Sequence, residues 1–219
     1  MRSHFSLAAG LCALIALAGC ASTKVTDRER YQGKRLARPD RILVYDFAAT
    51  AADLPKWAAA SDRFAGAPDA HTAEERATGR ELGVLVAADL VQQIQKMGLN
   101  AVRSSAAPGP KPGDIGLVGY FESIDEDSAA KRVVIGFASG AAQVKTQVEG
   151  YQMTELGMRK LGSAALDSRG GTGPMGVPLT VTAATANPIG LEIEGAARRT
   201  ADAIAEELRD VFKKQAWID

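Results

Sequence analysis

The sequence is poor in the residues that most often carry catalysis or crosslinks, with two histidines and two cysteines among 219 residues. Aromatic residues make up only 5%, and neither sign of charge is in excess, since 26 basic side chains are matched by 26 acidic ones. A neutral chain lacks the basic footprint that nucleic-acid binding requires, so we expect no nucleic-acid partner. A hydrophobic content of 46% and a charged content of 24% are typical of a globular domain. They exclude a disordered chain and a polytopic membrane protein.

The first nineteen residues predict a signal peptide rather than part of the fold. Arg2 supplies a positive charge, and residues 5–18 form an uncharged apolar run that is too short to span a bilayer as a helix. Small residues follow this run directly, as they do at the cleavage site of an exported protein. We therefore expect residues 1–19 to be removed.

The residues Leu17-Ala18-Gly19-Cys20 resemble the lipobox of bacterial lipoproteins. The resemblance implies cleavage before Cys20, diacylglycerol on its thiol and a further acyl chain such as palmitate on its new amine. Each buried methylene contributes ~0.8 kcal/mol, so two or three acyl chains hold a protein in the membrane almost permanently. By resemblance to enterobacterial sorting rules, the absence of aspartate at Ala21 favours the outer membrane, with the domain in the periplasm. The alternative is a conventional signal peptide that happens to end near Cys20.

Processing would leave few groups for catalysis. Cys12 leaves with the signal peptide and Cys20 becomes a thioether, so we expect neither a free thiol nor a disulfide in the mature chain. His71 is then the only histidine, which argues against a zinc site and against a serine or cysteine nucleophile with a histidine base. We therefore expect no metal, no cofactor and no enzymatic activity.

Three other patterns carry an alternative interpretation as ligand-binding or enzymatic sites. Asp46 ends the first expected strand, at the edge where α/β proteins place ligands. The run Asp125-Glu126-Asp127 offers oxygen ligands for calcium, but a charged hairpin tip is favoured because the glycine and distant glutamate of a calcium loop are absent. Residues 171–176 match the dinucleotide glycine pattern without a preceding strand and following helix, so we interpret them as a loop. An activity that uses Asp46, His71 or the acidic run remains a third hypothesis.

The mature chain divides into a polar segment and one domain. Residues 20–40, from the acylated cysteine onward, are polar and charged, which predicts a tether between membrane and domain. Residues 41–219 form the domain. Within it we expect strands at 41–47, 100–103, 115–124, 132–137, 143–153 and 158–167.

Two stretches of the domain predict long helices. Residues 72–98 begin with a capping box of Thr72 and Glu75 and place Leu82, Val86, Leu90, Ile94 and Met97 on one face. The C-terminal stretch repeats apolar residues at Ala197, Ala201, Ile204, Leu208 and Val211. Residues 48–71 predict a long loop that Trp57 and Phe64 pin to the surface. The elements together predict a single α/β (α+β) domain, with a mixed, largely antiparallel sheet and two long amphipathic helices packed on it.

Residues 170–191 carry no charge over 22 positions. Threonine, proline and glycine within this stretch exclude a membrane helix. An uncharged surface loop or edge strand is the favoured interpretation. The alternative is a hairpin that meets a partner or the bilayer, since a membrane strand needs only about 9–11 residues.

Several segments are similar to the bacterial family called domain of unknown function 4410. The similarity lies in the C-terminal amphipathic helix and in residues 41–47, 87–91, 114–121 and 132–137, and it covers nearly all of the mature domain. It implies an envelope lipoprotein, often of Proteobacteria, without an established activity and without catalytic residues to transfer.

The leading hypothesis from the sequence is a non-enzymatic outer-membrane lipoprotein whose periplasmic domain binds or scaffolds another envelope protein. The alternative is a subunit of an oligomeric secretion or pore-type envelope assembly, which the uncharged stretch 170–191 motivates.

Overall fold

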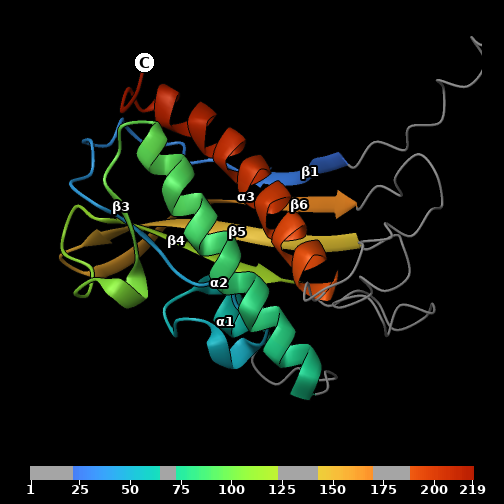
Figure 1. The fold of residues 1–219 in the computed structure, drawn as a ribbon. Helices are drawn as coiled ribbons and strands as arrows, with labels where there is room; N and C mark the ends of the chain where they lie inside the picture. The colour runs from blue at the N-terminus through green and yellow to red at the C-terminus, as the bar shows by residue number, and fades with distance from the viewer. Residues whose placement is uncertain (1–21, 65–72, 123–142, 170–187) are drawn as a thin grey trace, which may run out of the picture.

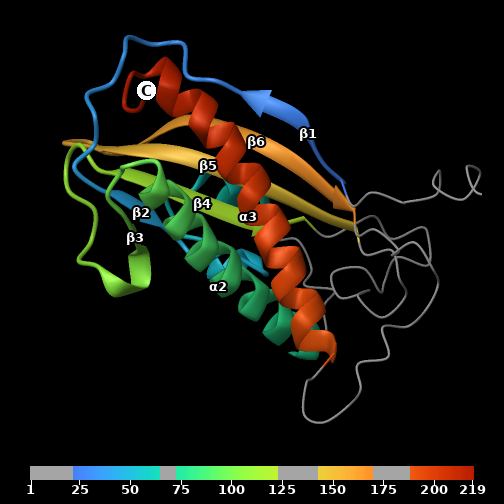
Figure 2. The same cartoon turned by 45° about the horizontal axis from the view of Figure 1, so that its top comes forward.

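The structure is a computed structural model that describes residues 22–64, 73–122, 143–169 and 188–219. These residues form one six-stranded sheet that carries two long helices, α2 and α3, on one face (Figure 1). The elements in chain order are β1 (Ser22–Glu29), β2 (Ile42–Val44), η1 (Ala51–Asp53), α1 (Ala59–Phe64), α2 (Ala73–Lys96), β3 (Ala101–Arg103), η2 (Ser104–Ala106), β4 (Ile115–Phe121), β5 (Gln143–Thr154), β6 (Gly157–Arg169) and α3 (Pro188–Lys214). Figure 2 shows α2 and α3 side by side over the same face of the sheet. The expected single α/β domain is confirmed.

The strand order is β1-β6-β5-β4-β2-β3. The short strand β2 runs parallel to β3 and to β4, whereas β4, β5, β6 and β1 pair antiparallel in turn. The sheet is therefore mixed and largely antiparallel, as the sequence predicts. The central strand β4 is buried along its whole length because both of its faces are covered.

The helix α2 follows the apolar pattern of the sequence. It lies within the expected range 72–98, and four residues of the predicted face are buried, namely Leu82, Val86, Leu90 and Ile94. The fifth, Met97, follows the helix and is partly buried, and α2 also buries Ala87. Gly98 has a φ of 82°, the left-handed conformation that commonly ends a helix. Thr72 of the expected capping box lies outside the described residues.

A close contact fixes α2 against the chain that follows β2. The backbone amide of Phe47 donates a hydrogen bond of 3.3 Å to the carbonyl of Gly83 in the middle of the helix. A Cβ atom at Gly83 would lie 2.0 Å from the Phe47 carbonyl oxygen, and one at Gly119 would lie 2.1 Å from the Phe47 ring. Phe47 is therefore packed between the helix and the sheet, against Gly83 and Gly119. At neither position is there room for a side chain larger than the hydrogen atom of glycine.

The helix α3 buries most, but not all, of its expected stripe. Ala197, Ala201 and Ile204 are buried, whereas Val211 is 41% exposed. Phe212 is buried in its place, and its ring lies 5.4 Å from the ring of Trp217. The stripe shifts by one residue because the C-terminal turn folds Trp217 back under the helix. The last four residues of the uncharged stretch belong to α3, which begins at Pro188.

The main difference from the sequence expectation concerns residues 20–40. Ser22–Glu29 form the edge strand β1, which pairs with β6, instead of a tether. The chain beyond it is held as well, since the Leu36 amide donates to the Gln215 side chain and the Trp217 indole donates to the Leu36 carbonyl. Figure 2 shows this segment passing over the C-terminal end of α3. The sheet of the domain therefore includes β1, upstream of Arg41.

The face of the sheet opposite the long helices is covered by the chain between β2 and α2. Here η1 and α1 replace part of the long loop expected at 48–71. A second apolar cluster forms between this segment and the sheet, from Ala48, Leu54, Ala58, Ala60, Val118 and Tyr120. Trp57 packs edge-on against Tyr45 and Tyr151, with ring centroids at 5.3 and 5.0 Å. The expectation that Trp57 holds this segment is confirmed.

Other expected elements lie beyond the part of the chain that the structure describes. They are the strand at 132–137, the acidic run at 125–127 and the segment at 171–176. Among the described residues, no helix is both long and apolar enough to cross a bilayer.

Candidate functional site

Most of the site residues expected from the sequence lie outside the described residues. They are Leu17, Ala18, Gly19 and Cys20 of the lipobox, His71, and Asp125, Glu126 and Asp127. Within the described ranges, no three histidine, cysteine, aspartate or glutamate side chains lie close enough to hold a metal ion.

Asp46 is described, and it forms an ion pair. Its carboxylate accepts hydrogen bonds of 2.6 and 2.7 Å from Nη2 of Arg103 and one of 2.9 Å from Nε. Both side chains are about one-third exposed, at 36% and 30%. The pair joins the chain after β2 to the end of β3. Asp46 is not among the residues that line the cavity described below.

The first described residue lies next to the expected anchor. β1 begins at Ser22, two positions after Cys20, and Ser22 pairs with Arg169 at the end of β6. Arg169 also pairs with Gln143 at the start of β5. Ser22, Gln143 and Arg169 therefore lie at the same end of the sheet.

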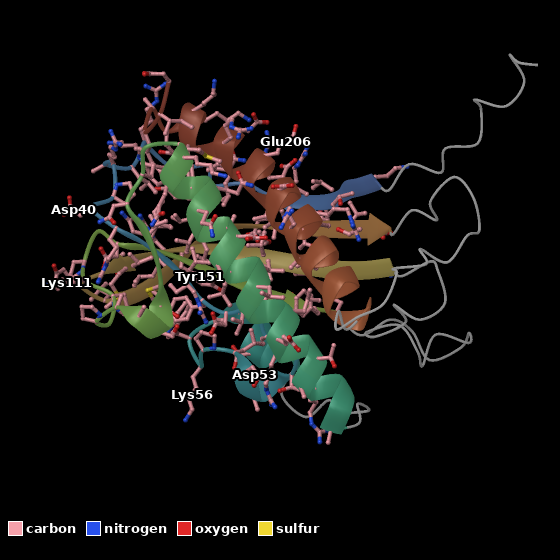
Figure 3. All side chains as sticks on the ribbon, in the orientation of Figure 1. Asp40, Asp53, Lys56, Lys111, Tyr151 and Glu206 are labelled. Carbon is pink, nitrogen blue, oxygen red and sulfur yellow. The ribbon has the colours of Figure 1, made fainter. Side chains whose placement is uncertain are left out.

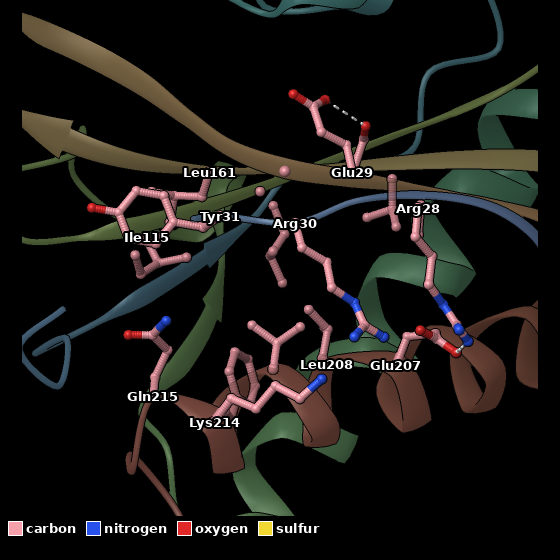
Figure 4. Close-up of a pocket in the computed structure, with 18 of the residues that line it drawn as sticks. Arg28, Glu29, Arg30, Tyr31, Ile115, Leu161, Glu207, Leu208, Lys214 and Gln215 are labelled. Atoms are coloured by element: carbon pink, nitrogen blue, oxygen red, sulfur yellow. Dashed lines mark hydrogen bonds and ion pairs between the residues drawn. The ribbon is translucent and has the colours of Figure 1, made fainter. Parts of the chain in front are cut away.

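A cavity of about 170 Å³ lies between the sheet and the C-terminal half of α3. Figure 4 shows its wall made by the end of β1 and by the sheet on one side and by α3 on the other. Most of its lining is apolar and includes Leu117, Val148, Leu161, Ile204, Leu208 and Phe212. Trp217 lines it from the C-terminal turn. The apolar lining can thus contact an apolar group.

Charged side chains surround the opening. Arg28 on β1 forms an ion pair with Glu207 on α3, and this carboxylate raises the pKa of the guanidinium through its hydrogen bond and charge. Glu29 points to the opposite face of the sheet, where it pairs with Lys160 at 2.6 Å, and Figure 4 shows it turned away from the cavity. Arg30 and Lys214 also line the cavity. Neither forms an ion pair within the described residues.

A buried polar cluster lies on the other face of the sheet. Glu149 on β5 is fully buried, and its carboxylate accepts a hydrogen bond of 2.7 Å from the Tyr151 hydroxyl. It also accepts one of 3.4 Å from the Ala60 amide, and the Lys160 ammonium lies 3.6 Å away. Figure 3 shows Tyr151 inside the fold, whereas Lys56 and Lys111 extend outward.

The tyrosines of this face have perturbed acidities. Burial raises the pKa of Tyr151, and its contact with the Glu149 carboxylate acts in the same direction. The hydrogen bond that the Tyr151 oxygen accepts from the Ala59 amide lowers the pKa, but by less than burial raises it. Burial also raises the pKa of Tyr45. Both hydroxyls therefore remain protonated at neutral pH, and that of Tyr151 donates its proton to the hydrogen bond with Glu149.

The sequence alone predicts neither the buried polar cluster around Glu149 nor the cavity beside α3, because both depend on segments that are distant in the sequence. The alternation of β5 places Glu149 on the face opposite Val148, as predicted, but nothing local indicates that residues 48–62 cover that face. The cavity needs β1 and the C-terminal turn, which are separated by more than 180 positions in the sequence and meet only in the fold.

Comparison with solved structures shows a distant likeness in fold. The PelC dodecamer from Paraburkholderia phytofirmans is 13% identical, with a TM-score of 0.39, and the match covers 82% of this chain and 96% of that one. A variant of the same dodecamer, in which a leucine is replaced by methionine, is 14% identical with a TM-score of 0.38, covering 82% and 95%. A comparison with curated proteins gives no match.

A family model decides the classification. The model described as domain of unknown function (DUF4410) matches residues 42–187, from β2 to the residue before α3. Because this match spans well over half of the 219 residues, the chain belongs to the DUF4410 family.

Proposed function

We propose that this chain is a non-enzymatic binding component of the bacterial cell envelope. In this proposal, acyl groups on Cys20 hold it in the outer membrane, and the α/β domain lies in the periplasm. The observation that carries the proposal is the start of β1 at Ser22, directly after the lipobox-like residues. Two residues of extended chain reach at most ~7 Å. The anchor would therefore hold the end of the sheet close to the membrane surface.

An anchor at this position would orient the domain relative to the membrane. Arg28 lies six residues beyond Ser22 on β1, which corresponds to about 20 Å at the rise of an extended strand. The cavity beside Arg28 would thus lie at the end of the domain away from the membrane. A site placed there is accessible to periplasmic partners, which favours a binding role.

The anchor is tested by labelling the full-length protein in cells with a radioactive or alkyne-tagged palmitate. We expect the wild-type protein to incorporate the label and its mature mass to begin at Cys20. Cys20→Ala should remove the label and leave the signal peptide attached. Cys12→Ala is the matched control, because it removes the other cysteine and should leave the labelling unchanged. Equal labelling of the wild type and Cys20→Ala would contradict the proposal.

Membrane choice and binding role need separate measurements. We expect the wild type in the outer-membrane fraction of a density gradient and Ala21→Asp in the inner-membrane fraction. Crosslinking in intact cells should join the acylated protein to a distinct envelope protein. Substitution of the cations Arg30 and Lys214, which form the rim of the cavity, should weaken this crosslink. A protein that crosslinks to nothing and purifies as a monomer would contradict a scaffolding role.

A second candidate function is a subunit of an oligomeric secretion or pore-type assembly. The specific observation is that the uncharged stretch 170–191 begins beside Arg169, at the end of the sheet where β1 starts. In this proposal the stretch contacts neighbouring copies or the bilayer. Deletion of residues 172–186 should then abolish a crosslinked ladder of the protein while its circular dichroism remains that of a folded domain. An unchanged ladder would exclude this function.

A further inference from the structure

The cavity between the sheet and α3 combines an apolar interior with an excess of positive charge at its opening. Five charged residues line it, namely Arg28, Glu29, Arg30, Glu207 and Lys214. Three of them are cations. Of the two carboxylates, Glu207 is already paired with Arg28, and Glu29 turns to the opposite face of the sheet and pairs with Lys160.

The two remaining cations lie on opposite sides of the opening. Arg30 follows β1, and Lys214 is the last residue of α3. Figure 4 shows the two side chains extending toward each other from the sheet side and from the helix. No carboxylate in the described part of the chain pairs with either. An anion that enters between them would meet two positive charges directly above an apolar interior.

We propose that this cavity binds a single-chain anionic amphiphile of the fatty-acid type. The hydrocarbon end occupies the space lined by Val148, Leu161 and Phe212, and the carboxylate lies between Arg30 and Lys214. This inference deepens the binding role proposed above and rests on it for the periplasmic location of the ligand.

The size of the cavity selects the ligand class. An engineered cavity of about 150 Å³ lined by leucine, isoleucine and phenylalanine holds benzene, so 170 Å³ accepts about six carbon atoms of a chain. A lipid with two acyl chains needs far more space. The opening also lies about 20 Å along β1 from the residue next to the anchor, which favours a free amphiphile over a lipid that remains in the bilayer.

Trp217 provides a direct readout of occupancy. It lines the cavity, it is 4% exposed, and its indole N–H donates to the Leu36 carbonyl at 3.1 Å. Trp57 is the only other tryptophan and lies on the opposite face of the sheet. A Trp57→Phe background therefore reports on the cavity alone.

The test uses the mature chain, residues 20–219, with Cys20→Ser to prevent acylation. We expect 8-bromooctanoate to quench Trp217, because bromine quenches indole on contact, and octanoate to reverse the quenching by competition. Each buried methylene strengthens binding by about fourfold. The affinity should therefore rise about 16-fold from butanoate to hexanoate and further to octanoate.

Substitution of the rim separates the charge from the apolar contribution. Arg30→Gln and Lys214→Gln should each weaken octanoate binding by up to about fivefold and should leave the binding of 1-octanol unchanged. Lys213→Gln is the matched control, since Lys213 is an exposed neighbour that does not line the cavity. Its octanoate affinity should equal that of the parent.

Three results would overturn the proposal. They are the absence of Trp217 quenching, an equal affinity for butanoate and octanoate, and an equal loss of octanoate and 1-octanol binding in the rim variants. A concentration-dependent dimer that protects Trp217 from 8-bromooctanoate would assign the cavity to a second copy of the chain and would also overturn it. These titrations use unacylated protein, so their failure is distinct from a failure of the palmitate-labelling test.

Discussion

Replacement of Glu149 by leucine tests how the sheet face opposite the long helices is stabilised. The carboxylate of Glu149 is fully buried and accepts hydrogen bonds from the Tyr151 hydroxyl and the Ala60 amide. Leucine removes the acceptor from both donors. A buried donor without a partner costs about 1–3 kcal/mol, and the loss of one member of a buried charged pair costs about 3–5 kcal/mol. We expect Glu149→Leu to lower the free energy of unfolding by about 3–5 kcal/mol.

A double-mutant cycle isolates the hydrogen bond between the two side chains. Tyr151→Phe removes the donor to Glu149 and the oxygen that accepts a 2.7 Å hydrogen bond from the Ala59 amide. Because the double variant loses the shared hydrogen bond only once, its destabilisation should be smaller than the sum of the two single effects by about 0.5–3 kcal/mol. Glu155→Leu is the matched control, because Glu155 is exposed in the turn between β5 and β6 and should change stability by less than about 0.5 kcal/mol.

The assay is urea unfolding of the mature chain at pH 7, followed by circular dichroism and by tryptophan fluorescence. Trp57 reports locally, since its ring lies 5.0 Å from that of Tyr151. Coincident transitions by the two probes justify a two-state free energy. Additivity of the single effects to within about 0.5 kcal/mol, or a Glu149→Leu variant as stable as the wild type, would refute this account of the cluster.

Three further predictions concern a glycine in α2, a part-exposed ion pair and the acidity of Tyr151. Gly83→Ala should lower the stability of the domain by about 1–3 kcal/mol, because the new Cβ would lie 2.0 Å from a backbone oxygen. This is opposite to the usual effect of alanine in a helix. Thermal melts should show no such loss for the control Gly109→Ala, where a Cβ meets no atom within 4 Å. Asp46→Asn should cost less than about 1 kcal/mol in urea unfolding, since the ion pair with Arg103 is part-exposed. The raised pKa of Tyr151 contributes stability that is present below pH 10 and is lost as pH rises further; Tyr151→Phe should reduce this alkaline loss by up to ~1.4 kcal/mol per pH unit.

The long helices and the inner strands are predictable because their apolar residues repeat with the period of the element. The pattern of Leu82, Val86, Leu90 and Ile94 predicts both the existence of α2 and the face that it buries. β5 is predictable for the same reason, since its side chains alternate with a period of two. In these elements the local pattern and the tertiary packing agree.

The edge strand could not be predicted in this way. Ser22–Glu29 contain one apolar residue, Val25, and the other seven side chains are polar or charged. Their contribution to the sheet is a ladder of backbone hydrogen bonds to β6, which any non-proline sequence can form. Edge strands are also commonly charged, which reduces pairing with other chains. Composition therefore predicts a tether where the fold places a strand.

The location of β1 changes what counts as the functional unit of this chain. The same eight residues follow the expected anchor, complete the sheet beside β6 and supply the Arg28 side chain to the cavity wall. A chain that began at Arg41, the domain start expected from the sequence, would lose this wall and would expose the backbone donors and acceptors of β6. In the proposed function, the anchor at Cys20 and the cavity are therefore joined through one continuous strand. A change in the residues that follow Cys20 would then act on both.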